Sequence, residues 1–165
     1  MLALEDKFAR TGYAARAALI LAKMQFDAGD VPAASAQLQW VIDRSDDVDL
    51  KEIARYRMAE VHLNQKQYDE ALKVLDAKHG DAYAGLYADL RGDALAAAGR
   101  TADARAAYEN ALAKLDAKSP YRTYVQVKLQ AVGGSVVAAP GVGGGSKPLP
   151  AAAPAPAAAP AAPKQ

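Results

Sequence analysis

Apolar residues recur along residues 13–132 at the three- and four-residue spacing of amphipathic helices. Three segments, residues 19–43, 57–76 and 90–116, each read as a helix, a tight turn and a second helix. Each second helix carries an alanine at the corresponding place, and these alanines are 37 and 33 residues apart. A period of about 34 residues is typical of stacked helical repeats. The pattern therefore predicts an all-α solenoid of about three helix pairs.

A seventh helix is predicted after the third pair, over residues 121–131. Ser119 and Pro120 open it, because proline is tolerated in a first helical turn, and Gly133 ends it. A repeat array needs an end cap that covers its last apolar face. The residues suited to that cap are Tyr121, Tyr124, Val125, Val127 and Leu129.

Short polar side chains stand where several of the helices should begin, and they can accept hydrogen bonds from free backbone N–H groups. Asp49 is followed three residues later by Glu52, which is the spacing of a capping box. The predicted N-cap residues are Asp30, Asp49, Asp81 and Thr101.

Composition divides the chain into a lead-in segment (1–12), a repeat domain (13–132) and a tail (133–165) of glycine, alanine and proline. The tail cannot bury enough apolar surface to offset its ordering entropy, so it is predicted to be a disordered spacer. A proline-motif ligand is the alternative, but no basic residue is well placed to orient it.

Composition also excludes several classes of function. The formal net charge is +1 with no basic run, which argues against a nucleic-acid surface. The absence of cysteine excludes disulfides and thiolate metal sites. The longest apolar run, residues 14–22, is interrupted by Arg16 and is far shorter than the roughly 18–20 residues that a membrane span requires. Residues 2–10 lack the apolar core of a signal peptide. We therefore expect a soluble chain.

Few side chains suggest catalysis. His62 falls at a packing position, and His79 falls near a predicted helix end. Asp46, Asp47 and Asp49 form an acidic loop without the glycine turn and bidentate glutamate of a calcium site. No nucleophile elbow, phosphate-binding loop or paired-histidine zinc motif occurs. The sequence predicts no catalytic residue, no metal site and no cofactor, and hence a protein that is not an enzyme.

Particular residues carry a resemblance to tetratricopeptide repeats. Small residues stand at repeat positions 8 and 20, where paired helices touch, and a large apolar residue stands at position 24. These residues are Ala22, Ala59 and Gly92 at position 8, Ala34, Ala71 and Ala104 at position 20, and Leu38, Leu75 and Tyr108 at position 24. The resemblance implies a tetratricopeptide-like solenoid whose C-terminal helix is the cap.

In such a stack, the first helices of successive repeats line a concave groove that binds partner proteins. Position by position, the resemblance assigns this groove to Arg16, Leu19, Lys23, Tyr56, Arg57, Glu60, Asn64, Asp89 and Asp93. Leu19, Lys23 and Arg57 replace the lysine and asparagine residues with which some repeat proteins clamp a terminal carboxylate. Binding of a chaperone's free C-terminus is therefore disfavoured.

Longer stretches are similar to one branch of the repeat family, the ancillary subunit of the SecYEG translocon. They are AALILAKMQFDAGD, AQLQWVID, YADLRGDALAAAGRTADARAAYENAL and YVQVKLQAVG. The resemblance implies a domain on the periplasmic side of the bacterial inner membrane, anchored through a span absent from this chain. The implied partners are translocon subunits and a membrane-anchored, prolyl-isomerase-like periplasmic chaperone.

Two alternatives remain at this point. A generic cytoplasmic repeat adaptor for another protein complex would share every feature of the repeats. Self-association into a homodimer through the exposed ends of the stack also stays open, because poorly capped solenoids leave apolar faces for a second copy.

Overall fold

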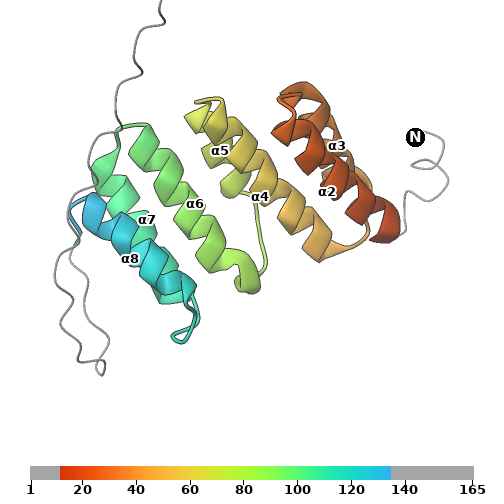
Figure 1. Cartoon of the computed structure of the whole chain (residues 1–165). Helices are drawn as coiled ribbons and strands as arrows, with labels where there is room; N and C mark the ends of the chain where they lie inside the picture. Colours follow the sequence, from red (N-terminus) through yellow and green to blue (C-terminus); the bar gives the residue numbers. More distant parts are fainter. Residues whose placement is uncertain (1–11, 135–165) are drawn as a thin grey trace, which may run out of the picture.

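The computed structural model describes residues 12–134, and every element in this range is helical. Figure 1 shows antiparallel helix pairs stacked side by side, with the last helix at the far end of the row. The elements are α2 (Gly12–Asp27), α3 (Val31–Arg44), α4 (Val48–Asn64), α5 (Tyr68–Leu75), the short 3-10 helix η1 (Asp81–Tyr83), α6 (Ala84–Ala97), α7 (Thr101–Lys114) and α8 (Tyr121–Ala131).

The predicted fold class is confirmed, since three pairs (α2/α3, α4/α5 and α6/α7) are followed by the single helix α8. None of the helices in the described range has the length and apolar character to cross a membrane. Of the predicted lead-in segment and tail, only residues 12, 133 and 134 fall within the described residues.

Small residues sit where the two helices of each pair meet, as the repeat pattern predicts. Ala34, Ala71 and Ala104 are all completely buried. The large residues at position 24 fill the space beside them, and Leu38, for example, is 2% exposed. Small side chains let the paired backbones approach, and the neighbouring large side chain then excludes water. The repeat positions therefore identify the interior of each pair.

The two helices of the third pair pack closely with a different combination of side-chain sizes. Its position-24 residue is Tyr108, whose ring lies directly against Gly92 of α6. A Cβ atom added at Gly92 would overlap that ring. Glycine is therefore required here because the facing residue is a tyrosine rather than a leucine.

The turns inside the three pairs share one backbone shape but not one residue type. Gly29 and Gly99 adopt positive φ angles of 83° and 77°. The middle turn reaches the same region with Lys66, whose φ is 62°. This left-handed conformation is costly for a residue with a Cβ atom.

Several predicted helix starts are wrong in detail. Asp47, not Asp49, is the N-cap of α4, and its carboxylate accepts a hydrogen bond from the Leu50 N–H at 3.2 Å. Thr101 is the first residue of α7 rather than its cap, and Asp81 begins η1. Asp30 does cap α3, accepting from the Ala33 N–H.

Helix α8 occupies the predicted range, but it covers the third pair with fewer residues than expected. Val125 and Leu129 are buried against the core of α6 and α7. Tyr124 and Val127 are 57% and 60% exposed, so they do not belong to the covering face. A helix of 11 residues presents only one narrow stripe to its neighbours, and residues four apart define it.

Candidate partner-binding groove

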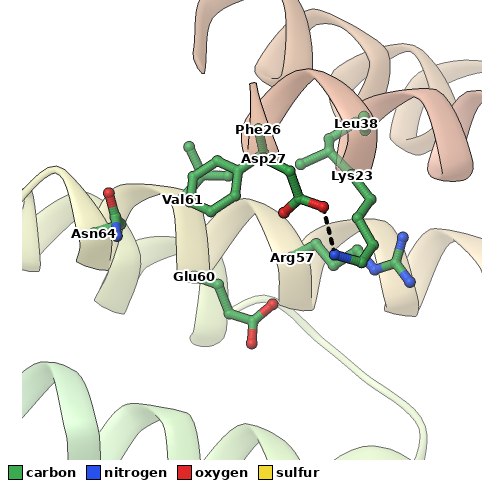
Figure 2. Close-up of a pocket in the computed structure, with 9 residues that line it drawn as sticks. Lys23, Phe26, Asp27, Leu38, Arg57, Glu60, Val61 and Asn64 are labelled. Carbon is green, nitrogen blue, oxygen red and sulfur yellow. Dashed lines mark hydrogen bonds and ion pairs between the residues drawn. The ribbon is translucent and has the colours of Figure 1, made fainter. Parts of the chain in front are cut away.

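A pocket of about 420 Å³ opens between the first helices of repeats one and two (Figure 2). Four of the predicted groove residues line it: Lys23, Arg57, Glu60 and Asn64. Its other lining residues are Ala22, Phe26, Asp27, Leu38 and Val61. The pocket therefore combines an apolar floor with a charged rim.

Helical spacing explains why these residues gather there. On α4, Arg57, Glu60 and Asn64 follow one another at three and four residues, so they lie along one helix face. On α2, Lys23 and Asp27 are likewise one turn apart and lie on the facing helix. The close packing of α2, α3 and α4 supplies the floor.

The two cations of the rim are already engaged within the protein. The Lys23 ammonium lies 2.7 Å from the Asp27 carboxylate, in a pair whose side chains are both more than half exposed. Arg57 donates through Nη1 to the Leu19 carbonyl oxygen at 2.9 Å. Arg57 thus joins α4 to α2 in addition to lining the pocket.

Glu60 is the carboxylate of the rim that forms no salt bridge with any residue in the described range. Burial raises its pKa above the usual value, Arg57 opposes this, and the negative charge of Asp93 adds to it. The charged form of Glu60 is therefore less favourable in the folded protein than in water.

The third repeat presents its predicted groove residues differently, because α8 lies over them. Lys128 of α8 reaches Asp89 at 2.8 Å and Asp93 at 2.7 Å. The Tyr121 hydroxyl donates to Asp89 at 2.5 Å, and the Tyr108 hydroxyl donates to Asp93 at 2.8 Å. Asp89 is only 1% exposed. These two carboxylates are thus covered by the chain's own last helix.

Charge and burial act on Lys128 in opposite directions. Burial alone would lower its pKa, but the hydrogen bonds to Asp89 and Asp93 outweigh this effect and raise it. Lys128 therefore stays charged beneath the surface, where its ammonium also lies 4.5 Å from the Tyr124 ring centroid. A polar network, as well as apolar packing, holds α8 in place.

The remaining predicted residues lie outside the pocket lining. Leu19 is buried in the first apolar cluster, and Arg16 is exposed on α2. Tyr56 is half-buried, and its ring centroid lies 6.1 Å from that of Tyr87. Burial is the main reason that its pKa is raised. The structure thus brings together four of the nine predicted residues in one pocket.

Sequence reasoning missed the role of two residues. The pattern predicts no role for Lys128, although Lys128 lies three residues after Val125 and therefore close to the covering face of α8. The spacing from Asp49 predicts that Glu52 is part of a capping box. It is instead buried, and it accepts a hydrogen bond from the Tyr87 hydroxyl at 2.9 Å.

The histidines and the acidic loop have structural roles. His62 lies 2.8 Å from the Gln67 side-chain oxygen, and the His79 ring packs on the Tyr87 ring at 4.6 Å. Asp47 in the acidic loop caps a helix. Within residues 12–134, no group of three or more histidine, cysteine, aspartate or glutamate side chains is arranged to hold a metal ion.

Comparison with known proteins places this geometry in a family. Residues 1–134 match the model of the tetratricopeptide repeat-like domain. The chain is 38% identical over 127 residues to the "Ancillary SecYEG translocon subunit" of Escherichia coli (strain K12), covering 75% of this chain and 61% of that protein. It is 33% identical over 129 residues to the protein of the same name from Neisseria gonorrhoeae (strain ATCC 700825 / FA 1090), covering 78% and 62%.

The chain thus spans about three fifths of the length of these curated relatives. No solved structure matches it significantly. The family match extends over all seven described α-helices, from α2 to α8, including the pairs that form the pocket and the helix that covers the third repeat. The chain belongs to the tetratricopeptide repeat-like domain family.

Proposed function

We propose that this chain is the repeat domain of a non-catalytic, ancillary subunit of the bacterial Sec translocon. In this role it binds another protein in the groove between α2 and α4. The observation that carries the proposal is the open pocket with an apolar floor and charged rim, in a fold that works by holding proteins. The names of the two relatives supply the association with the translocon.

The proposal places the domain on the periplasmic side of the inner membrane. Attachment to the membrane is then the task of a segment other than the helices in the described range. The bound proteins are secreted chains that emerge from the translocon and a membrane-anchored, prolyl-isomerase-like chaperone that receives them. The domain brings the two together and performs no chemistry on either.

Photo-crosslinking in the cell tests this proposal. A photoreactive amino acid replaces Asn64, which lines the pocket and is exposed, in the full-length gene product. Tyr56 and Arg57 are unsuitable, because Tyr56 packs on Tyr87 and Arg57 binds the Leu19 carbonyl. Ala106, which is exposed on α7, is the control position.

We expect adducts with translocon subunits or periplasmic chaperones from position 64, identified by mass spectrometry, and few from position 106. Recovery of cytoplasmic proteins alone would discard the Sec assignment in favour of a cytoplasmic adaptor. Equal adducts from both positions would move the interface away from the groove.

A further inference from the structure

We propose that the groove selects an extended protein segment in which a lysine or arginine lies close to a large apolar residue. The apolar side chain enters the pocket against Phe26, and the cation lies against Glu60, on the side of α4 that faces Asp93. This inference rests on the proposed use of the groove for protein binding. It does not depend on the association with the Sec translocon.

The apolar half of the proposal follows from the pocket walls. Ala22, Leu38 and Val61 are buried and form the floor, while the half-buried ring of Phe26 forms one side. Figure 2 shows Phe26 and Val61 close together at the centre of the pocket, with the charged side chains around them. A volume of about 420 Å³ is within the range of ligand pockets. An apolar side chain would gain burial there without displacing any polar contact.

The preference for a cation follows from the partners that the charged groups of the groove already have. Lys23 is bound to Asp27, and Arg57 is bound to a backbone carbonyl. Glu60 is left without a salt bridge among the described residues, and burial together with Asp93 disfavours its charged form more than the nearby Arg57 favours it. A cation from a partner would relieve that cost, whereas an anion would increase it.

The neighbouring third repeat also carries an excess of negative charge. Among residues 12–134, Asp89 and Asp93 form salt bridges with one shared cation, Lys128. One oxygen of Asp89, Oδ1, is buried without a hydrogen-bond partner among the described residues. The strip from Glu60 to Asp89 therefore carries more negative than positive charge. Because α8 covers Asp89, charge complementarity favours a basic group at the exposed Glu60, on the side of α4 that faces Asp93.

Binding of short labelled peptides to the full chain, followed by fluorescence anisotropy, tests the inference. The probe is a ten-residue Gly/Ser peptide with one lysine and one leucine two residues apart. Its variants carry Lys→Gln or Leu→Ala. The protein variants are Glu60→Gln and, as a matched control, Glu109→Gln on the exposed face of α7. Circular dichroism confirms that each variant is folded.

We expect Glu60→Gln to weaken binding of the lysine peptide about fivefold and Glu109→Gln to leave it unchanged. The Lys→Gln peptide should lose a similar factor, and it should lose no more on Glu60→Gln, since the two changes remove the same contact. Independent, additive losses, or an equal loss from the control variant, would overturn the inference.

The chain's own tail is a potential competitor, because it contains Lys147 and Leu149 two residues apart. A chain with Lys147→Gln and Leu149→Ala is therefore measured in parallel. Tighter peptide binding by this chain would show that the tail competes for the same groove, and would support the proposed chemistry. If neither chain binds the lysine peptide better than its variants, the inference fails. Adducts from position 64 would still support the proposed function in that case.

Discussion

Side chains at the same repeat position have different surroundings in the first two repeats and in the third. Position 9 is Lys23, Glu60 and Asp93 in successive repeats. Lys23 and Glu60 are exposed at the rim of an open pocket, whereas Asp93 is bound by Lys128 and Tyr108. The difference shows that a position in this fold stays open to solvent only where no further helix covers it.

The ion pairs at the open pocket and beneath α8 differ accordingly in how much they contribute to stability. The Lys23–Asp27 pair is exposed on both sides, at 65% and 58%, so water screens it and its net contribution is small. In the Lys128–Asp89 pair the side chains are only 16% and 1% exposed. There, each charge depends on the other, because water cannot replace a missing partner.

The largest expected effect tests this contrast directly. Lys128→Ala would leave Asp89 buried without its cation and should lower the free energy of unfolding by about 3 kcal/mol. Lys23→Ala, the matched change in the open region, should lower it by less than about 0.5 kcal/mol. Urea unfolding followed by circular dichroism measures both. Similar losses for the two variants would contradict the distinction between covered and open regions.

A second prediction concerns the packing inside the pairs. Gly92→Ala places a Cβ atom against the Tyr108 ring and should cost about 2 kcal/mol. Combining it with Tyr108→Leu reproduces the alanine–leucine pair that repeat one forms with Ala22 and Leu38. The double variant should therefore be more stable than the sum of the two single changes predicts.

The same urea titrations give this coupling as a double-mutant cycle. Tyr108→Leu alone is the necessary reference, because it also removes the hydrogen bond to Asp93. Strict additivity would mean that glycine at position 92 is not there to accommodate the tyrosine.

A third prediction concerns the turn that joins α4 to α5 in the open region. Lys66→Gly relieves the left-handed backbone and should raise the free energy of unfolding by about 1 kcal/mol. The matching turns at positions 29 and 99 already contain glycine, so Gly99→Lys should have the opposite effect. Thermal unfolding measures both. A destabilised Lys66→Gly chain would show that the lysine side chain makes a compensating contact.

The interior of the pairs could be predicted from the sequence, because close helix contact restricts a position to small residues wherever it recurs. The alanines at positions 34, 71 and 104 carry this signal, and all three are fully buried. Helix starts were harder to place. Asp47 and Asp49 are both good N-cap residues, and the choice between them depends on how α4 packs.

The groove was only partly predictable for a similar reason. Repeat positions indicate which side chains face inward, and in the structure Lys23 and Glu60 line the pocket. They cannot indicate which of these side chains another element will cover. The contact between Lys128 and Asp89 joins residues 39 apart, and it depends on the angle at which α8 packs against the third pair. Such an angle follows from packing rather than from local periodicity.

The smallest expected effect concerns Glu60 and the pH dependence of stability. Its pKa in the folded protein is raised from 4.5 by burial and by Asp93, against the opposing effect of Arg57. The folded state therefore binds this proton more tightly than the unfolded state. As the pH rises from 4.5 through the raised pKa, Glu60 must lower the free energy of unfolding, and above that window its cost is constant.

Glu60→Gln should be slightly more stable than the unchanged chain at pH 7 and equally stable at low pH. Urea titrations of both chains at several pH values give this difference. A difference that does not vary with pH would mean that Glu60 is as well solvated as Lys23. The charged Glu60 carboxylate would then not destabilise the folded protein.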